Sequence, residues 1–422
     1  MNPEKFITRS MQDPRILRIL SAALEAVDPF SAVQRHLPDI TGRTYGLAIG
    51  KAAIPMMDAL AGLVPLSGGL AVSKHTSGLS RNLYTLLEGG HPIPDARSLT
   101  AGWAVLDFVS SLKDDDTLIC LISGGGSALV TAPYEEISLE DMQMLTSLLL
   151  SCGARIDEIN ILRRHLDRVK GGGVVRATKA LIISLILSDV TGNQLEAIAS
   201  GPTAPDPSTR EDALDVLSKY QLPDQIPSSI RHSLKAFDET SKPGDPIFNR
   251  VRNIIIGDNA LAARSASEQA KREGFLTEVL TTELRGEARE VGYALAKQLR
   301  EAVETRPHPF CLMAGGETTV TILGNGKGGR NQELALAAVP ELDGLQDAML
   351  IALATDGEDG PTDAAGAVVT GESAQKAESL GLDVTGYLFR NDAYPFFEAL
   401  GGLLKPGPSG TNVNDLVFLC TL

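Results

Sequence analysis

The stretch Thr117–Ser127, TLICLISGGGS, decides the fold class. Its apolar run has no polar alternation and leads directly into three consecutive glycines. Apolar runs of ~4–8 residues without alternation are typical of strands that are buried on both faces of a sheet. A glycine-rich turn that follows such a strand and opens a helical pattern is typical of a βα unit. The stretch therefore predicts an α/β protein with a largely parallel sheet.

The same pattern of apolar run, turn and helical segment occurs four more times. The runs are Tyr45–Gly50, Ala180–Ser188, Arg252–Gly257 and Ala348–Thr355. In open α/β sheets, ligands bind outside the carboxyl ends of the strands. All five turns follow such an end, so we expect their residues to line one cleft.

Length and composition predict two globular domains with small-molecule partners. A chain of 422 residues suits two domains of ~100–200 residues or somewhat more. Prolines, serines and charges gather between Pro223 and Pro246, so we divide the chain into residues 1–240 and 241–422. The first helical pattern, Pro14–Val27, could pack on the second domain. Acidic residues exceed basic ones by 53 − 38 = 15, which argues against nucleic acid and anionic membranes as partners.

The cysteines and the apolar runs point to a cytoplasmic location. The four cysteines, Cys120, Cys152, Cys311 and Cys420, form no CxxC pair, so we expect buried thiols in a reducing compartment. The longest apolar run, Ala180–Leu187, is too short for a membrane span of ~20 residues. The N-terminal stretch has no apolar signal-peptide core.

The glycine run after the first quoted strand is a candidate anion site. It consists of Ser123, Gly124, Gly125, Gly126 and Ser127. Consecutive glycines let several backbone N–H groups converge on one phosphate or carboxylate. The alternative is a plain tight turn between strand and helix. No GxxxxGK[ST] sequence occurs in the chain, and the run Ser123–Ser127 is not a GxGxxG motif, so we do not expect a common P-loop or dinucleotide loop here.

Four cationic residues lie next to glycines. Lys51 follows a strand end, and the loop Gly324–Arg330 (GNGKGGR) carries both Lys327 and Arg330. The guanidinium of Arg330 suits carboxylate or phosphoryl oxygens. Lys170 precedes three glycines, where it is either a binding residue or part of a glycine cap that ends the preceding helix.

Two aspartates complete the predicted chemistry. Asp189 and Asp356 each end an apolar run, and carboxylates at neighbouring strand ends suit Mg²⁺ together with substrate phosphates. The alternative role for each is a helix N-cap, and one of them could instead accept a proton from a substrate hydroxyl. His91 lies in a proline-rich loop and is as consistent with a structural role as with ligand contact. No zinc-type cluster and no GxSxG sequence occurs. A glycine nest with cations and carboxylates favours phosphoryl transfer.

The chain resembles the class II glycerate 2-kinases, whose C-terminal part is called the MOFRL domain and some of whose members are named hydroxypyruvate reductases. The matching stretches span nearly the whole chain: GKAAIPM at 50–56, GGHPIPDARS at 89–98, LISGGGSALV at 121–130, NILRRHLDRVKGGG at 160–173, LSDVTGNQLEAIASGPTAPDPST at 187–209, GDNALAA at 257–263, GGETTVTILGNGKGGRNQELALA at 315–337, TDGEDGPTDAAGA at 355–367 and GTNVNDL at 410–416.

The resemblance implies an ATP- and Mg²⁺-dependent kinase that phosphorylates the C2 hydroxyl of D-glycerate. It also implies an N-terminal Rossmann-like domain and a C-terminal α/β domain, with the active site in the cleft between them. The resemblance and the residue patterns together give the candidate site: catalytic Lys51, Arg330 and Asp189, binding residues Ser123–Ser127, Lys170, Asn259, Glu317 and Lys327, and metal ligands Asp189 and Asp356.

Three positions depart from the family pattern, and two other functions stay open. Asn193 and Ala314 stand where aspartate and serine are common, and Glu358 fills a variable position. None of them is an assigned catalytic residue. The alternatives are an NAD(P)H-dependent hydroxypyruvate reductase and a non-catalytic glycerate or nucleotide sensor. The sequence leaves open which loop holds ATP and which holds glycerate, and also whether the chain forms a homo-oligomer.

Overall fold

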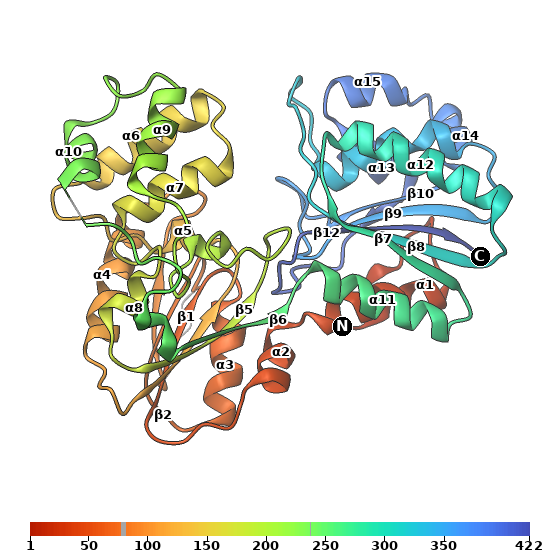
Figure 1. Cartoon of the computed structure of the whole chain (residues 1–422). Coiled ribbons are helices and arrows are strands. Elements are labelled where there is room, and N and C mark those ends of the chain that lie inside the picture. Colours follow the sequence, from red (N-terminus) through yellow and green to blue (C-terminus); the bar gives the residue numbers. More distant parts are fainter. Residues whose placement is uncertain (77–81, 237) are drawn as a thin grey trace. The chain divides into compact units, whose positions relative to one another are not determined.

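The computed structural model describes residues 1–76, 82–236 and 238–422, which divide into two compact units (Figure 1). Unit 1 comprises Met1–Asp28 and Gly257–Leu422, and unit 2 comprises Pro29–Ile256. The chain thus leaves unit 2 later than the expected division near residue 240, because β6 (Val251–Gly257) pairs with the sheet of unit 2. Each unit is described by itself.

Unit 2 contains a six-stranded sheet in the order β3-β2-β1-β4-β5-β6. The neighbouring pairs β3/β2, β2/β1, β1/β4 and β4/β5 are all parallel. The other strands are β1 (Thr44–Ile49), β2 (Leu66–Ser73), β3 (Thr85–Glu88), β4 (Thr117–Ile122) and β5 (Leu181–Leu187). This order is that of the doubly wound fold, in which ligands bind where the order reverses, between β1 and β4. The expected Rossmann-like sheet is therefore confirmed.

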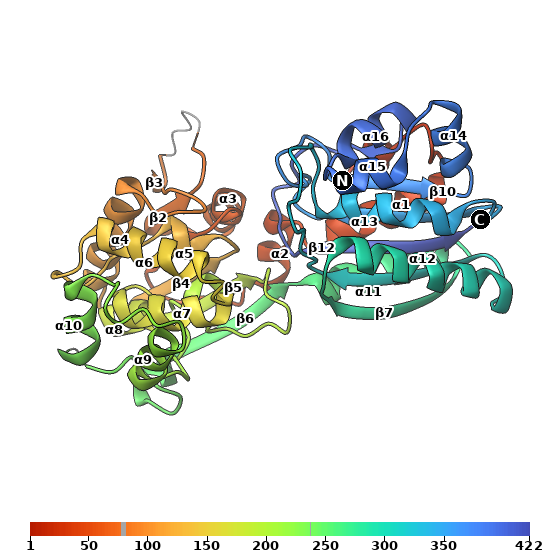
Figure 2. The same cartoon turned by 90° about the horizontal axis from the view of Figure 1, so that it is seen from above.

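Helices cover both faces of this sheet and form a further cluster of their own. The helices are α2 (Pro29–His36), α3 (Ala53–Leu63), α4 (Ala96–Ser110), α5 (Gly126–Leu129), α6 (Leu139–Ser151), α7 (Ile156–Leu166), α8 (Gly173–Ala177), α9 (Arg210–Lys219) and α10 (Ser228–Ala236), with short 3₁₀ turns at Ile198–Ser200 and Pro246–Arg250. One face packs against α2 and α3, and the other against α4 and α8. The α6, α7, α9 and α10 helices share a separate apolar core (Figures 1 and 2).

Unit 1 contains a six-stranded mixed sheet in the order β11-β10-β9-β12-β8-β7. Its strands are β7 (Leu276–Leu284), β8 (Phe310–Gly316), β9 (Ala348–Ala354), β10 (Gly366–Thr370), β11 (Leu403–Leu404) and β12 (Asp415–Thr421). The central β12 strand is antiparallel to both of its neighbours, so its first residue lies between the carboxyl ends of β8 and β9. The sheet of unit 1 is thus not largely parallel, although the turns after β8 and β9 still meet at one edge.

Helices also cover both faces of the second sheet. They are α1 (Pro14–Ala26), α11 (Asn259–Arg272), α12 (Ala288–Thr305), α13 (Arg330–Leu342), α14 (Ser373–Ser379), α15 (Val384–Phe389) and α16 (Ala393–Leu400), with a 3₁₀ turn at Pro3–Phe6. The α1 and α11 helices lie on one face, and α12 and α13 lie on the other (Figure 1). The stripe Ile16, Leu20 and Leu24 of α1 is buried in this unit, and each such side chain contributes about 1.5–3 kcal/mol. The first helix therefore packs within the unit that holds the C-terminal half.

Candidate active site

The turns after β1 and β4 are tied together at the switch point of the first sheet. The Lys51 N–H donates to the Gly124 carbonyl at 2.9 Å, and the Ala52 N–H donates to Ser123 Oγ at 3.0 Å. Gly50 has φ +128°, and a Cβ there would come within 2.2 Å of Ser123 Oγ. Only glycine allows the two turns to approach this closely. The half-buried Lys51 side chain is thereby held beside the glycine run.

The glycine run itself is packed against two candidate residues. A Cβ on Gly124 would meet Asp189 Oδ2 at 2.0 Å, so the Asp189 carboxylate lies directly against this backbone. A Cβ on Gly125 would lie 3.3 Å from Lys51 Cγ and 3.3 Å from His91 Nε2. Sequence analysis expected Lys51, Asp189 and Ser123–Ser127 near one another, and the structure brings them together at the ends of β1, β4 and β5. Whether they bind substrate stays a prediction.

A strained loop with a hydroxyl chain borders this site. Ala199 and Ser200 both adopt left-handed backbone conformations, with φ of 51° and 60°. Ser200 Oγ is 2.8 Å from Ser127 Oγ and donates to Asn160 Oδ1 at 3.2 Å. Such backbone strain costs about 1–3 kcal/mol per residue and gathers at ligand sites. The sequence analysis did not single out this loop, because isoleucine, alanine and serine at 198–200 have no preference for a left-handed backbone.

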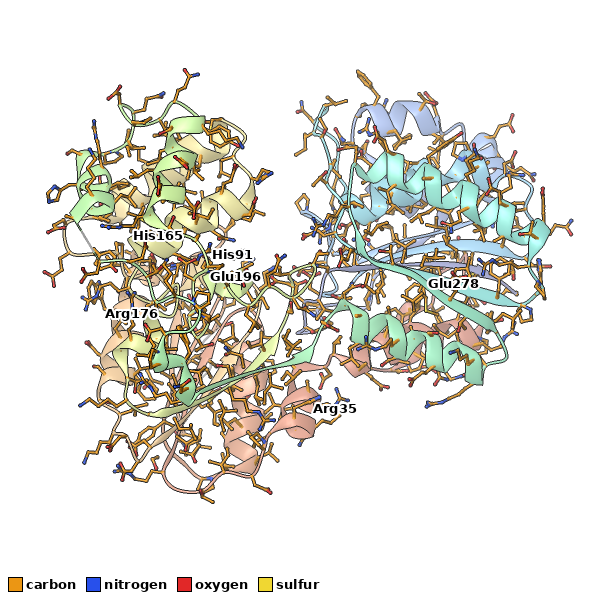
Figure 3. All side chains as sticks on the ribbon, viewed as in Figure 1. Arg35, His91, His165, Arg176, Glu196 and Glu278 are labelled. Carbon is orange, nitrogen blue, oxygen red and sulfur yellow. The ribbon has the colours of Figure 1, made fainter. Side chains whose placement is uncertain are left out.

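His91 joins the group as a neutral imidazole. Burial and, to a smaller extent, the positive charges of Lys51 and Lys74 together lower the pKa of His91 to about 4. At neutral pH the ring is uncharged, so one nitrogen can donate a hydrogen bond and the other can accept one. His91 belongs to unit 2 and is labelled in Figure 3. Its ring lies next to Gly125, the residue that precedes α5.

Replacing Lys51 by methionine is expected to raise the pKa of His91. A protonated His91 ring beside the Lys51 ammonium is unfavourable, so removing the ammonium makes protonation of His91 easier. Burial still keeps the pKa of His91 below the ordinary histidine value of 6.5. The measurement is an NMR titration of the histidine rings, with His91→Gln to assign the signal. The matched control is Lys113→Met, which removes an exposed ammonium. An unchanged His91 pKa in Lys51→Met would show that the two side chains do not interact.

The Lys170 side chain is buried and paired instead of open to solvent. It is 2% exposed, and its ammonium donates to Asp167 Oδ2 at 2.5 Å and to the Val130 carbonyl at 2.9 Å. Its helix, α7, already ends at Leu166, so the glycines after Lys170 do not cap it. The predicted glycine cap was therefore wrong, and the binding role stays a prediction for a buried lysine whose charge pairs with Asp167.

The second group of predicted residues gathers around Arg330, at the first residue of α13. The guanidinium donates from Nε to Asp415 Oδ2 at 2.6 Å and from Nη2 to Asp415 Oδ1 at 3.1 Å. Nη1 donates to Glu317, which directly follows β8. Burial acts to lower the pKa of Arg330, but the charges of Asp415 and Glu317 outweigh it and raise this pKa. Arg330 is thus fully charged and held by two carboxylates.

Two buried aspartates support the arginine. Asp359 accepts hydrogen bonds from the backbone N–H groups of Asn331 at 3.1 Å and Gln332 at 2.9 Å, which caps the start of α13 in place of a side chain on Gly329. Burial raises the pKa of Asp359, and these hydrogen bonds act against it. Burial also raises the pKa of Asp415 to about 7, against the lowering effect of the Arg330 charge. Neither aspartate was singled out from the sequence.

Asn259 and Lys327 differ from each other in how open their side chains are to a ligand. The Asn259 amide donates to the Val413 and Asp415 carbonyls, each at 2.9 Å, and so ties the start of α11 to the start of β12. Lys327 is exposed, and its ammonium lies 3.8 Å from the centre of the Tyr394 ring. Asn259 thus has a supporting position within the fold, and only Lys327 keeps a side chain open to solvent.

The two expected metal ligands do not end neighbouring strands. Asp189 follows β5 in the sheet of unit 2, and Asp356 follows β9 in the sheet of unit 1. The prediction of paired carboxylates was wrong because two separate sheets looked like one in the sequence. Within the described residues, no group of three or more His, Cys, Asp or Glu side chains is arranged to hold a metal ion.

Comparison with known proteins assigns the family. Residues 15–235 match a domain of unknown function, DUF4147, and residues 310–415 match the MOFRL family. A D-glycerate 2-kinase from Thermotoga maritima is 42% identical over 97% of this chain and 99% of its own length. A glycerate 2-kinase from Pyrococcus horikoshii is 40% identical over 95% of this chain and 96% of its own length. The chain belongs to the glycerate kinase family.

Solved structures agree with this membership. The crystal structure of a glycerate kinase from T. maritima superposes with a TM-score of 0.89 at 41% identity, covering 96% of this chain and 98% of that chain. A family relative from Agrobacterium vitis, 36% identical over 94% of this chain and 92% of its own length, carries the name putative hydroxypyruvate reductase. No helix within the described residues of this glycerate kinase family member is long and apolar enough to cross a membrane.

Proposed function

We propose that this chain is a glycerate 2-kinase, which transfers the γ-phosphoryl group of ATP to the C2 hydroxyl of D-glycerate and releases 2-phosphoglycerate and ADP. The observation that carries the proposal is the switch point of the first sheet. There Lys51, the glycine run and Asp189 form a cationic, glycine-lined site with a carboxylate against it. Relatives that match nearly the whole chain are named for the same reaction.

The reaction needs a proton acceptor and neutralisation of the transferred charge. The C2 oxygen of glycerate forms a bond to the γ-phosphorus while the bond from that phosphorus to the ADP oxygen breaks. Asp189 takes the hydroxyl proton, because its half-buried carboxylate is held against Gly124 at the end of β5. Lys51 and Arg330 supply positive charge to carboxylate and phosphoryl oxygens.

The donor groups fit Mg²⁺ at either aspartate. Mg²⁺ usually takes one or two protein carboxylates and completes its shell with substrate phosphates and water. Asp189 and Asp356 are single carboxylates at strand ends, so each fits this set with phosphate oxygens. A bound Mg²⁺ would neutralise phosphate charge.

We also propose a cytoplasmic location, which the four free cysteines support, although Cys152 is only partly buried.

The reductase alternative has weaker support. The strand order of unit 2 is the one that binds dinucleotides, and one relative carries the reductase name. A dinucleotide site needs a glycine-rich turn after β1 on which the pyrophosphate lies. Here that turn reads GKAA, with Lys51 beside a single glycine. The kinase reading therefore explains more of the site.

The test is a phosphorus NMR assay of the purified chain with Mg²⁺-ATP and D-glycerate. The expected products are 2-phosphoglycerate and ADP in equal amounts, and L-glycerate serves as the control substrate. Formation of 3-phosphoglycerate would keep the kinase but contradict the position of transfer. If no phosphoryl group moves and NADH or NADPH is consumed with hydroxypyruvate, the chain is a reductase.

A further inference from the structure

The Arg330 guanidinium is held by a carboxylate that is more buried than the guanidinium itself. The side chain of Asp415 is 7% exposed, whereas that of Arg330 is 31% exposed. Both Asp415 oxygens accept from the arginine, at 2.6 and 3.1 Å, in a fork-to-fork pair. Asp415 thus fixes both the place and the plane of the guanidinium from the inner side.

Asp415 is itself fixed by its position in the sheet. It is the first residue of β12 and pairs with Gly316 at the end of β8 and with Ala354 at the end of β9. Its carbonyl also accepts a hydrogen bond from Asn259 at 2.9 Å. The start of β12 is therefore held by β8 on one side, by β9 on the other, and by Asn259 at the start of α11.

The guanidinium keeps donors for a ligand. An arginine side chain has about five N–H donors. Two of them go to Asp415 and one goes to Glu317, so one N–H on Nη1 and one on Nη2 have no partner among the described residues. Two N–H groups at a fixed orientation suit two oxygens of one phosphoryl or carboxylate group.

We propose that Asp415 is a positioning residue that acts through Arg330, and that Asn259 holds Asp415 in place. The inference rests on the function proposed above, in which Arg330 contacts the transferred or substrate anion. Asp415 does not touch substrate; it orients the arginine so that its two remaining N–H groups meet the ligand oxygens. Small misplacements of such groups can lower rates by about 100-fold.

The alternative is that the Asp415–Arg330 pair only stabilises unit 1. The two roles differ in what the removal of Asp415 changes. Loss of a stabilising contact lowers the melting temperature and leaves the turnover of the folded enzyme unchanged. Loss of a positioning contact lowers kcat of the folded enzyme, and this loss disappears when Arg330 is already absent.

The experiment is a double-mutant cycle with Asp415→Asn and Arg330→Gln in the full chain, measured by kcat and KM for D-glycerate and ATP. We expect Asp415→Asn to lower kcat about 100-fold with each KM within about threefold of wild type. Arg330→Gln should lower kcat further. The double variant should match Arg330→Gln within about threefold, because the proposed role of Asp415 acts through Arg330 alone.

Asp13→Asn is the matched control. Asp13 holds Arg15 with the same kind of paired contact in unit 1, with Arg15 Nη2 donating at 2.8 Å, so this variant removes an aspartate–arginine pair away from the candidate site. Its kcat should stay within about twofold of wild type. If Asp415→Asn does not fold, Asp415→Glu keeps the charge but shifts the pair by one methylene, and we expect its kcat to fall at least tenfold.

Two results would overturn the inference while leaving the kinase intact. One is a wild-type kcat in folded Asp415→Asn or, where that variant does not fold, in Asp415→Glu. The other is a double variant whose loss equals the product of the two single losses. If the wild-type chain transfers no phosphoryl group to D-glycerate, the proposed function is wrong, and the role given to Asp415 is wrong with it.

Discussion

Lys51→Met is expected to lower the turnover of the glycerate kinase reaction by about 1,000-fold while the fold stays intact. Removal of one preorganised charge or donor from a transition state commonly costs a factor of about 100–1,000. Lys51 has that character because its backbone is bonded to Gly124 and its side chain lies over Gly125. Methionine keeps the length and most of the apolar contact of the stem, so only the charge is removed.

The measurement is kcat with saturating Mg²⁺-ATP and D-glycerate, together with the melting temperature. Lys113→Met provides the matched control, since it makes the same chemical change at an exposed lysine of the same unit. The control should keep wild-type turnover. A kcat of Lys51→Met within about tenfold of wild type, at an unchanged melting temperature, would exclude Lys51 from the transition state.

Local patterns predicted the strands and the position of the first site. The apolar runs that end at Ile49, Ile122 and Leu187 all form strands, and their turns meet at one edge of unit 2. This worked because a parallel sheet places all carboxyl ends on the same side. The capping box of Ser138 and Asp141 is another feature with a local signal, since its two residues lie within four positions of the sequence.

Long-range pairing explains what the sequence could not predict. Asp415 lies beside Arg330 only because β12 inserts between β8 and β9, which depends on register across about a hundred residues of chain. Lys170 pairs with Asp167 in the core, although a lysine followed by three glycines is also typical of a helix C-terminus. Asp189 and Asp356 look equivalent in sequence but end strands of different sheets.

The backbone at Asn193 shows why asparagine is tolerated at this position, which departs from the family pattern. Asn193 has φ 56°, and its N–H donates to the Val190 carbonyl at 3.0 Å in the turn after β5. Asparagine and aspartate both tolerate this left-handed conformation better than most residues. The position therefore demands a residue that accepts the turn, and asparagine meets that demand without a charge.

Gly124→Ala is expected to lower kcat at least 100-fold, although it adds only a methyl group. The new Cβ would lie 2.0 Å from Asp189 Oδ2 and 2.5 Å from Asp189 Cγ, so the carboxylate must move by more than an ångström. Gly124 does not have a left-handed backbone, so alanine causes no conformational strain. The displaced group is the proposed proton acceptor, and a shift of this size can cost about 100-fold in rate.

Gly62→Ala is the matched control, because a Cβ at Gly62 in α3 meets no atom within 4 Å. It should keep full activity and gain about 0.5–1 kcal/mol in the free energy of unfolding from better helix propensity. The decisive comparison adds Gly124→Ala to Asp189→Ala. The added methyl should then cost nothing further in kcat, since the carboxylate that it displaces is absent. An equal loss with and without Asp189 would mean that the methyl disturbs the loop itself, and Asp189 would then lose its support as the proton acceptor.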